Sequence, residues 1–239
     1  LAAGRTLASM SWGRAEALEA KSSDVSNWTL TGRVAGATWV GTASCFVVKA
    51  SLSDGGQGLF LVQRDAPGFA AVASNEELGF RSANLGSLSF EKTSAALLTK
   101  VDADVAAVHA RVQLALGAVA VGLGHAATEV GQRYALDRKQ FGKPIATFQA
   151  IQFKLVDMRT EVEAGRLLTW QAANNPDAPG AVAMARLFAG GAALRAANEC
   201  LQIHGGYGFT EEFPAERLYR DAQIVKILAG SSQAQRLVV

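Results

Sequence analysis

The spacing of apolar and polar residues changes near residue 100, from short strand-like runs to long helix-like ones. Before that point, apolar or alternating segments are separated by turn residues such as Asp54-Gly55-Gly56 and Ala66-Pro67-Gly68, a pattern typical of β-strands joined by loops. The expected strands are Arg5–Trp12, Glu16–Ser22, Trp28–Val34, Ser44–Ala50, Leu59–Arg64 and Leu85–Phe90. We therefore expect residues 1–100 to form a small antiparallel β-domain.

After residue 100 the apolar residues recur at helical spacing. Gly205-Gly206 ends one such segment, Pro214 opens the next, and Gly230 ends that one in turn. The expected helices are Asp104–Leu136, Phe148–Ala173, Ala181–His204, Ala215–Leu228 and a last one that begins at Ser231 or Ser232. Residues 101–239 should therefore form an antiparallel bundle of four or five helices, which makes the chain α+β.

Three glycines of the first long helix, Gly117, Gly122 and Gly124, are expected to let a neighbouring helix approach closely. Their spacing does not indicate a phosphate-binding loop, because no Lys-Ser/Thr pair follows and no strand precedes them.

Composition and charge narrow the classes of function. The chain has 239 residues, of which 49% are apolar and 18% charged, so it can bury a sizeable core. Its net charge is +2 and its basic residues form no run longer than Arg138-Lys139, which argues against nucleic acid or an anionic membrane as partner. The most apolar stretch, residues 112–124, is too short to span a membrane. We recognise no signal peptide, and expect Cys45 and Cys200 to be buried free thiols in the cytoplasm.

Local motifs by themselves indicate little chemistry. Three histidines, His109, His125 and His204, share no metal-ligand spacing with the two cysteines. A glycine corner such as Gly205-Gly206 can present backbone N–H groups to a phosphate, or it can simply end a helix. On spacing alone the structural interpretation is favoured.

Longer segments resemble a known family. The C-terminal helical domain of acyl-CoA dehydrogenases is similar to "RYALDRKQFGKPIATFQAIQFKLVDM" (133–158), "CLQIHGGYGFTEEFPAERLYRDA" (200–222) and "GSSQAQR" (230–236). The segment "LGFRSANLGSLSFE" (78–91) resembles the end of the middle β-domain of that family. The resemblance implies a middle β-domain at 1–100, a helical-bundle domain at 101–239, and an FAD-dependent α,β-dehydrogenation of an acyl-CoA thioester.

The resemblance also assigns cofactor residues. In the family FAD lies at a subunit interface, and one subunit grips the ADP half of its neighbour's cofactor. Arg138 should pair with the pyrophosphate, with Gln140 and Phe141 beside it, and Phe148 and Gln149 should border the adenine. The remaining residues carried over are Gln202, Gly205 and Gly206 of the second corner, and Ser231, Ser232 and Gln233 at the start of the last helix.

Two departures from the family pattern concern catalysis. The family commonly carries the base that removes the α-proton in a Tyr-Glu-Gly-Thr corner, but here Ala229 stands at the Glu position. In some branches the base lies on the first long helix, at about Val112 here, and again no carboxylate is present. The flavin-binding elements of the β-domain also differ, because only Ser11 resembles the expected Thr and Trp39 reads best as a core residue.

The hypothesis from the sequence is a non-catalytic subunit of a heteromeric acyl-CoA dehydrogenase. A paralogous subunit would supply the base and the flavin pocket. The two kinds of subunit would form a heterotetramer or another even-numbered assembly with two-fold symmetry. Electron-transfer flavoprotein or a similar protein would accept the electrons. The substrate would be a fatty acyl-CoA or a steroid-CoA. Two alternatives stay open: a homomeric dehydrogenase with a non-standard base, and a non-enzymatic scaffold on the same fold.

Overall fold

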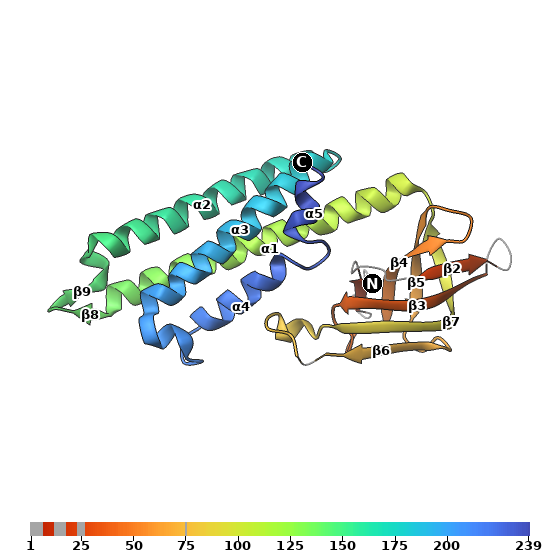
Figure 1. The fold of residues 1–239 in the computed structure, drawn as a ribbon, viewed down its shortest axis with the longest axis horizontal. Helices are drawn as coiled ribbons and strands as arrows, with labels where there is room; N and C mark the ends of the chain where they lie inside the picture. The colour runs from red at the N-terminus through yellow and green to blue at the C-terminus, as the bar shows by residue number, and fades with distance from the viewer. Residues whose placement is uncertain (1–6, 12–17, 23–26, 75) are drawn as a thin grey trace. The chain divides into compact units, whose positions relative to one another are not determined.

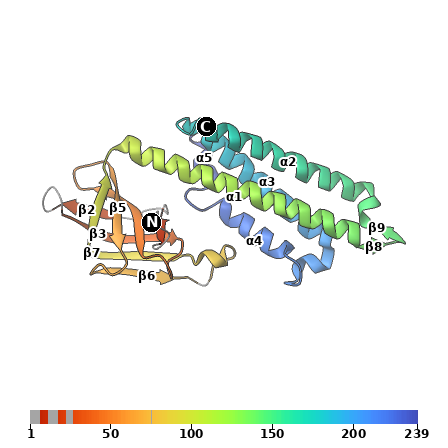
Figure 2. The ribbon, with the colours of Figure 1, turned by 180° about the vertical axis from the view of Figure 1, so that it is seen from behind.

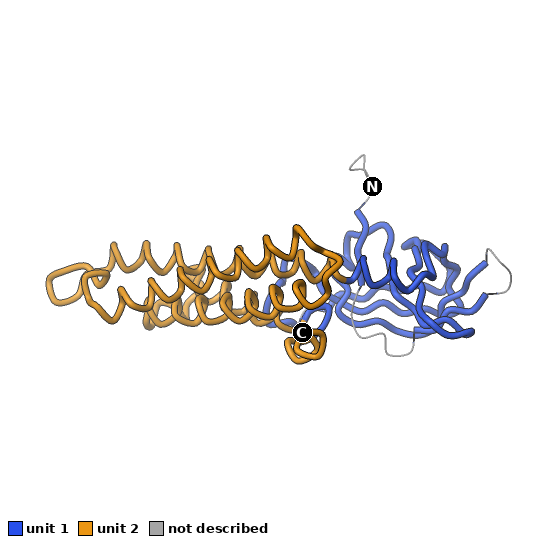
Figure 3. The backbone as a smooth tube through the Cα atoms, turned by 90° about the horizontal axis from the view of Figure 1, so that it is seen from above, with its two compact units in different colours: residues 1–109, 228–230 blue, residues 110–227, 231–239 orange. Residues whose placement is uncertain are grey.

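The computed structural model describes residues 7–11, 18–22, 27–74 and 76–239. The chain divides into two compact units, coloured separately in Figure 3. Unit 1 comprises residues 1–109 and 228–230, and unit 2 comprises residues 110–227 and 231–239. The start of the first long helix and the corner around Ala229 therefore both belong to unit 1.

Unit 1 is built around a seven-stranded sheet. Because β5 pairs with both β7 and β4, the strands β4, β2, β3, β7 and β5 form a closed ring. Three phenylalanines, Phe46, Phe60 and Phe90, fill its core. The strands are β1 (Ala8–Ser11), β2 (Glu19–Ser22), β3 (Trp28–Ala37), β4 (Cys45–Leu52), β5 (Gln57–Gln63), β6 (Phe69–Ala73) and β7 (Gly86–Thr99).

The β-domain expected from the sequence is present, with three differences in detail. Strand β4 pairs parallel with β1 and β2, whereas the other pairings of the sheet are antiparallel. Strand β6 was not expected, because most of its residues are exposed or half-buried and its apolar pattern is weak. Strand β7 runs past Phe90 to Thr99. Residues 5–6, 12 and 16–17 of the first two expected strands lie outside the described residues.

Unit 2 is a helical bundle, in which α2 and α3 run side by side (Figures 1 and 2). The long helices lie close to their expected positions, but α4 ends at Val225 rather than Leu228, and a small hairpin that was not expected follows α1. The elements are α1 (Asp102–Asp137), β8 (Lys139–Gln140), β9 (Lys143–Pro144), α2 (Gln149–Asn174), α3 (Pro179–His204), α4 (Ala215–Val225) and α5 (Ser232–Arg236). Short 3-10 turns lie at Arg81–Ala83, Ile145–Thr147 and Gly205–Phe209.

The two cysteines are free and buried, as expected. Cys200 lies on the inner face of α3, and burial raises the pKa of its thiol to about 12. The thiol is therefore protonated and unreactive at neutral pH.

Helix α1 corrects one expectation from the sequence. It contains an 18-residue window of mean hydropathy 1.5, so by length and composition it is long and apolar enough to cross a membrane. The expectation that the apolar stretch is too short to span a membrane considered only residues 112–124, whereas the helix extends from Asp102 to Asp137. The core helix of a soluble protein passes the same test, and in unit 2 this helix packs closely on α2 and α3 through Gly124 and Gly131.

Among Gly117, Gly122 and Gly124 of α1, close packing explains one glycine but not another. A Cβ atom at Gly124 would lie 2.7 Å from Cγ2 of Val162 and 3.2 Å from Cα of Ala193, so both neighbouring helices approach its backbone. A Cβ at Gly117 would make ordinary contacts, and one at Gly122 would meet nothing within 4 Å. The expectation of close approach was thus right for Gly124 and wrong for Gly122.

These two glycines give a matched pair of variants. Gly124→Ala is expected to lower the free energy of unfolding by about 1–3 kcal/mol, because the added methyl overpacks the contact with α2 and α3. Gly122→Ala should raise it by about 0.5–1 kcal/mol, because alanine has the higher helix propensity and the space is open. Urea denaturation measures both. Equal effects of the two substitutions would contradict the packing shown here.

Candidate functional site

Two corners of the bundle, far apart in sequence, line one cavity. The cavity has a volume of about 460 Å³ and lies where the hairpin after α1 meets the end of α3. Four of the residues expected to bind the cofactor are among those that line it: Arg138, Gln140, Gly205 and Gly206. The others are Tyr134, Ile145, Ile203, His204, Tyr207 and Thr210.

Local structure fixes the position of Arg138. Helix α1 ends at Asp137, and the chain then turns back through the β8–β9 hairpin, whose turn residues Phe141 and Gly142 have φ of 52° and 79°. The backbone N–H of Ile145 donates to the carbonyl oxygen of Arg138 at 2.8 Å and closes the loop. The guanidinium carbon of Arg138 lies 5.6 Å from the ring centroid of Tyr207, a distance at which a cation is attracted to the ring face.

The second corner has a glycine that its own fold does not require. Gly205 has φ of 59° and ψ of −134°, a conformation that favours glycine. Gly206 is not in the left-handed region, and a Cβ atom there would meet nothing within 4 Å. Neither conformation nor packing within the chain therefore explains Gly206. A ligand that approaches the bare backbone would explain it.

Aromatic rings form the wall behind this corner. The ring of His204 is 3% exposed, stacks on Tyr134 at 4.1 Å between centroids and meets Phe213 edge-on. Nδ1 of His204 lies 2.8 Å from the carbonyl oxygen of Cys200, to which it can donate. Burial lowers the pKa of His204, so the ring is neutral at pH 7 and serves as packing.

The other expected cofactor residues lie elsewhere on unit 2. Phe141 is 91% exposed at the hairpin turn, and its ring meets that of Phe148 edge-on at 6.2 Å. Gln149 is the first residue of α2, and the carbonyl oxygen of Gln202 accepts from the N–H of Gly205. None of these four residues lines the cavity of Arg138.

The start of α5 lines a second cavity. Ser231, Ser232 and Gln233 border a space of about 720 Å³, together with Leu187, Phe188, Gly191, Arg195, Gln223, Lys226, Ile227 and Arg236. The hydroxyl of Ser231 accepts from the N–H of Ala234 at 3.2 Å and caps the helix. Gly191 lines this cavity and His204 lines the cavity of Arg138. Both residues lie on α3, roughly 20 Å apart at a rise of 1.5 Å per residue. Seven of the expected cofactor residues therefore divide between these two cavities, and the other four line neither of them.

The two positions expected for a catalytic base hold no ionisable group. Ala229 is in the left-handed conformation with φ of 56°, and its carbonyl oxygen lies 3.4 Å from Nε2 of His109. Val112 is half-buried, and its neighbour Gln113 accepts from Nε2 of Gln235 at 3.2 Å. The contact of His109 with Ala229 could not be predicted from the sequence, because no local pattern relates positions so far apart along the chain.

The β-domain residues considered for flavin contact differ from expectation in one case. Trp39 is 42% exposed and has φ of 55°, so its assignment to the core was wrong. The backbone N–H of Trp39 donates to the carbonyl oxygen of Ala83 at 2.7 Å, which holds this residue at the surface of unit 1. Ser11 is 1% exposed.

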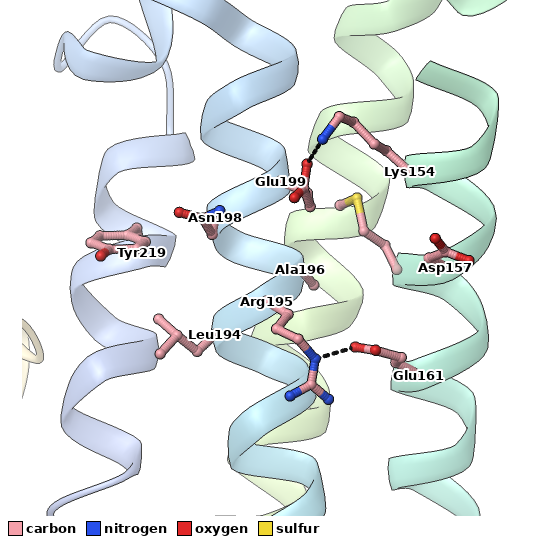
Figure 4. Close-up of a pocket in the computed structure, with 10 residues that line it drawn as sticks. Lys154, Asp157, Glu161, Leu194, Arg195, Ala196, Asn198, Glu199 and Tyr219 are labelled. Atoms are coloured by element: carbon pink, nitrogen blue, oxygen red, sulfur yellow. Dashed lines mark hydrogen bonds and ion pairs between the residues drawn. The ribbon is translucent and has the colours of Figure 1, made fainter. Parts of the chain in front are cut away.

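A third cavity, of about 450 Å³, lies between α2, α3 and α4 and holds none of the expected residues (Figure 4). Two ion pairs cross it: Lys154 pairs with Glu199, and Nε of Arg195 lies 2.7 Å from Oε2 of Glu161. Both link α2 to α3, so these charges serve helix packing. In the described part of the chain, no group of three or more His, Cys, Asp or Glu residues could hold a metal ion.

Comparison with known proteins gives one consistent family. A model of the acyl-CoA dehydrogenase C-terminal domain matches residues 106–239. The mitochondrial short-chain specific acyl-CoA dehydrogenase of Bos taurus is 36% identical over 230 residues, which cover 90% of this chain and 56% of that protein. The chain thus spans about half the length of the curated relatives it matches.

Solved structures of similar fold agree. Butyryl-CoA dehydrogenase from Megasphaera elsdenii superposes with a TM-score of 0.88 at 29% identity, covering 98% of this chain and 67% of that one. Glutaryl-CoA dehydrogenase from Mycobacterium smegmatis, solved in complex with FADH2, gives a TM-score of 0.88 at 25% identity, covering 99% of this chain and 65% of that one.

Proposed function

The chain belongs to the acyl-CoA dehydrogenase family, and from this premise we propose that it is a subunit of an FAD-dependent acyl-CoA dehydrogenase. The reaction is the α,β-dehydrogenation of an acyl-CoA thioester, in which bound FAD takes up two electrons. The observation that carries the proposal is the cavity that Arg138 and the bare backbone of Gly206 both line.

The residues present at this cavity fit the ADP half of FAD. Arg138 can donate two parallel hydrogen bonds to phosphate oxygens, and Gln140 adds an amide beside it. Gly205 and Gly206 leave room for the ligand to reach backbone N–H groups. The aromatic wall of Tyr134 and Tyr207 excludes water from one side and keeps the guanidinium in place.

We infer that this subunit supplies no α-proton base of its own. Both positions at which the family places a carboxylate hold aliphatic residues, Ala229 and Val112. A paralogous chain with an intact Glu-Gly-Thr corner would hold the flavin ring and carry the base, and this chain would complete the FAD site across the interface. The assembly would be a heterotetramer in the cytoplasm, with electron-transfer flavoprotein or a similar protein as acceptor.

The visible absorption spectrum tests the shared site. The chain purified alone should be colourless, and the chain co-expressed with a family member that carries the Glu-Gly-Thr corner should be yellow, at about one flavin per pair of chains. A chain that is yellow when purified alone, with one flavin per chain that bleaches on addition of an acyl-CoA, would contradict the proposed shared site.

That second outcome would instead favour a homomeric enzyme with a non-standard base. Two observations are compatible with this alternative function. The side chain of Trp39 is exposed, so it is not committed to the core of the β-domain. The imidazole of His109 lies at the corner where the family carries its base, with Nε2 3.4 Å from the carbonyl oxygen of Ala229. Burial is the largest cause that lowers the pKa of His109, which keeps the imidazole neutral at pH 7.

A further inference from the structure

The α5 cavity, the space of about 720 Å³ at the start of α5, has a lining of unbalanced charge. Three of its side chains are basic, Arg195, Lys226 and Arg236, and the described residues that line it include no Asp or Glu. The chain as a whole nearly balances 23 Lys and Arg residues against 21 Asp and Glu residues. Positive groups that border one cavity repel each other, and an anion between them would relieve this repulsion.

Two of the three basic groups have no carboxylate partner in the described part of the chain. Lys226 is the first residue after α4, and its ammonium group makes no hydrogen bond or ion pair with any described residue. Arg236 donates from one terminal nitrogen to the carbonyl oxygen of Ser232 at 3.2 Å, which is an uncharged acceptor. Both side chains therefore bring a positive charge to the cavity that the described residues do not neutralise.

The third basic group, Arg195, is fixed in place while its end stays available. Its Nε lies 2.7 Å from Oε2 of Glu161 on α2. Figure 4 shows the two terminal nitrogens of Arg195 pointing away from that carboxylate. Glu161 lines the cavity between α2, α3 and α4 and not the α5 cavity, whereas Arg195 lines both. Glu161 thus orients the guanidinium and leaves its terminal N–H groups for an acceptor in the α5 cavity.

A glycine in the interior of α3 keeps room for this guanidinium. Gly191 borders the α5 cavity in the middle of a 26-residue helix, where alanine has the higher helix propensity. A Cβ atom there would have its three nearest contacts with the guanidinium of Arg195, the closest being a terminal nitrogen at 3.2 Å. Packing against a neighbouring helix therefore does not explain Gly191. The bare backbone lets the guanidinium lie close to the helix, beside the open space.

Apolar residues complete the lining and restrict the kind of anion. Leu187, Phe188 and Ile227 also border the cavity, and the last two are 36% and 66% exposed. The volume falls in the range of roughly 300–1,000 Å³ that is typical of sites for small organic ligands, and an inorganic phosphate would fill little of it. A phosphorylated compound with a flat or apolar body satisfies both parts of the lining, because its phosphates meet the cations and its body meets the apolar side chains.

We propose that the α5 cavity binds a free nucleoside diphosphate, with the phosphates between Arg195, Lys226 and Arg236 and the base against Phe188. The site is separate from the cavity of Arg138, because no residue lines both cavities. The bound nucleotide is therefore not the ADP half of the FAD proposed for the first cavity. Ser231, Ser232 and Gln233, which the family resemblance relates to FAD, would border this nucleotide instead.

Calorimetric titration of ADP into the full-length Arg138→Gln chain tests the site without a contribution from the first cavity. ADP should bind once per chain with a dissociation constant on the order of 10–100 μM. Inorganic pyrophosphate should bind about 10-fold more weakly, because it has no base to stack on Phe188. ADP should also raise the melting temperature, since it binds only the folded chain.

Lys226→Gln in the same background should raise the dissociation constant of ADP by about 10-fold or more, because a charge-assisted hydrogen bond to phosphate is lost. Arg217→Gln is the matched control. It removes an exposed basic residue of α4 that does not line the cavity, so the dissociation constant should stay within about twofold.

Two substitutions at Gly191 separate anion binding from stability. Gly191→Glu places a carboxylate four residues before Arg195, the spacing of a favourable ion pair on a helix, so the melting temperature should not fall. The same carboxylate competes with phosphate for the cations and should raise the dissociation constant of ADP by about 100-fold or more. Gly191→Gln adds nearly the same bulk without the charge, and its effect should be about 10-fold smaller.

Three results would overturn the proposal: no binding of ADP to the Arg138→Gln chain below about 1 mM, binding that survives Lys226→Gln and Gly191→Glu, or equal dissociation constants for Gly191→Glu and Gly191→Gln. These titrations use the chain alone, whereas the flavin content is measured on the co-expressed assembly. Failure of the nucleotide site and failure of the shared FAD site are therefore distinguishable.

Discussion

Replacing the carboxylate of the partner's Glu-Gly-Thr corner with glutamine is expected to lower the turnover of the shared-site assembly by a factor of about 10²–10⁴, the usual effect of losing a general base. Ala229→Glu in this chain should change turnover by less than about twofold. The reason is that, under the proposed division of labour, the partner holds the flavin ring and supplies the base, so a carboxylate at position 229 of this chain has no flavin site to serve. Stopped-flow reduction of the flavin by an acyl-CoA measures the step directly.

Ala229→Gln provides the control for this experiment. It adds the bulk of glutamate without a proton acceptor at the same left-handed position, where φ is 56°. A gain in rate with Ala229→Glu but not with Ala229→Gln would show that this chain has a working flavin site. The division of labour between two subunits would then be wrong.

Arg138→Gln is expected to weaken FAD binding to the assembly by about 100-fold, because charge-assisted hydrogen bonds to phosphate oxygens contribute about 1.5–3 kcal/mol each. Arg133→Gln is the matched control. It removes an exposed arginine near the end of α1 that does not line the cavity, and FAD affinity should stay within about twofold of the wild type. Flavin fluorescence on dilution gives both dissociation constants.

Gly206→Ala distinguishes a ligand contact from a structural role. The added methyl meets nothing within 4 Å in the chain, so the melting temperature should not fall. FAD affinity should nevertheless fall, because the methyl occupies the space through which the ligand reaches the backbone. A normal FAD affinity for both Arg138→Gln and Gly206→Ala would mean that this cavity is not a cofactor site.

Structural features that depend on local spacing could be read from the sequence. The helical stripe of α2, the glycine corner after α3 and the capping serine of α5 all act over a few residues, and they place these helices within two residues of the expected starts. Strand β6 could not be predicted from the sequence, because it is defined by its pairing with β7 rather than by an apolar pattern of its own.

Burial and proximity could not be read in this way. The sequence placed Trp39 in the core, because tryptophan is usually buried, but its left-handed backbone turns it outward. Gly122 and Gly124 look equivalent in the sequence, and which of them faces Val162 and Ala193 depends on how three helices pack together.

By itself, then, the sequence determined the succession of strands and helices, the resemblance to a flavoprotein family and the absence of a carboxylate at position 229. Only the tertiary structure decided that Arg138 and Gly206 share one cavity, that Ser231 belongs to another, and that the carbonyl oxygen of Ala229 lies beside His109. The physical reason is that periodicity and turn chemistry act over a few neighbouring residues. Cavities and long-range contacts arise only when segments that are distant in the chain pack together.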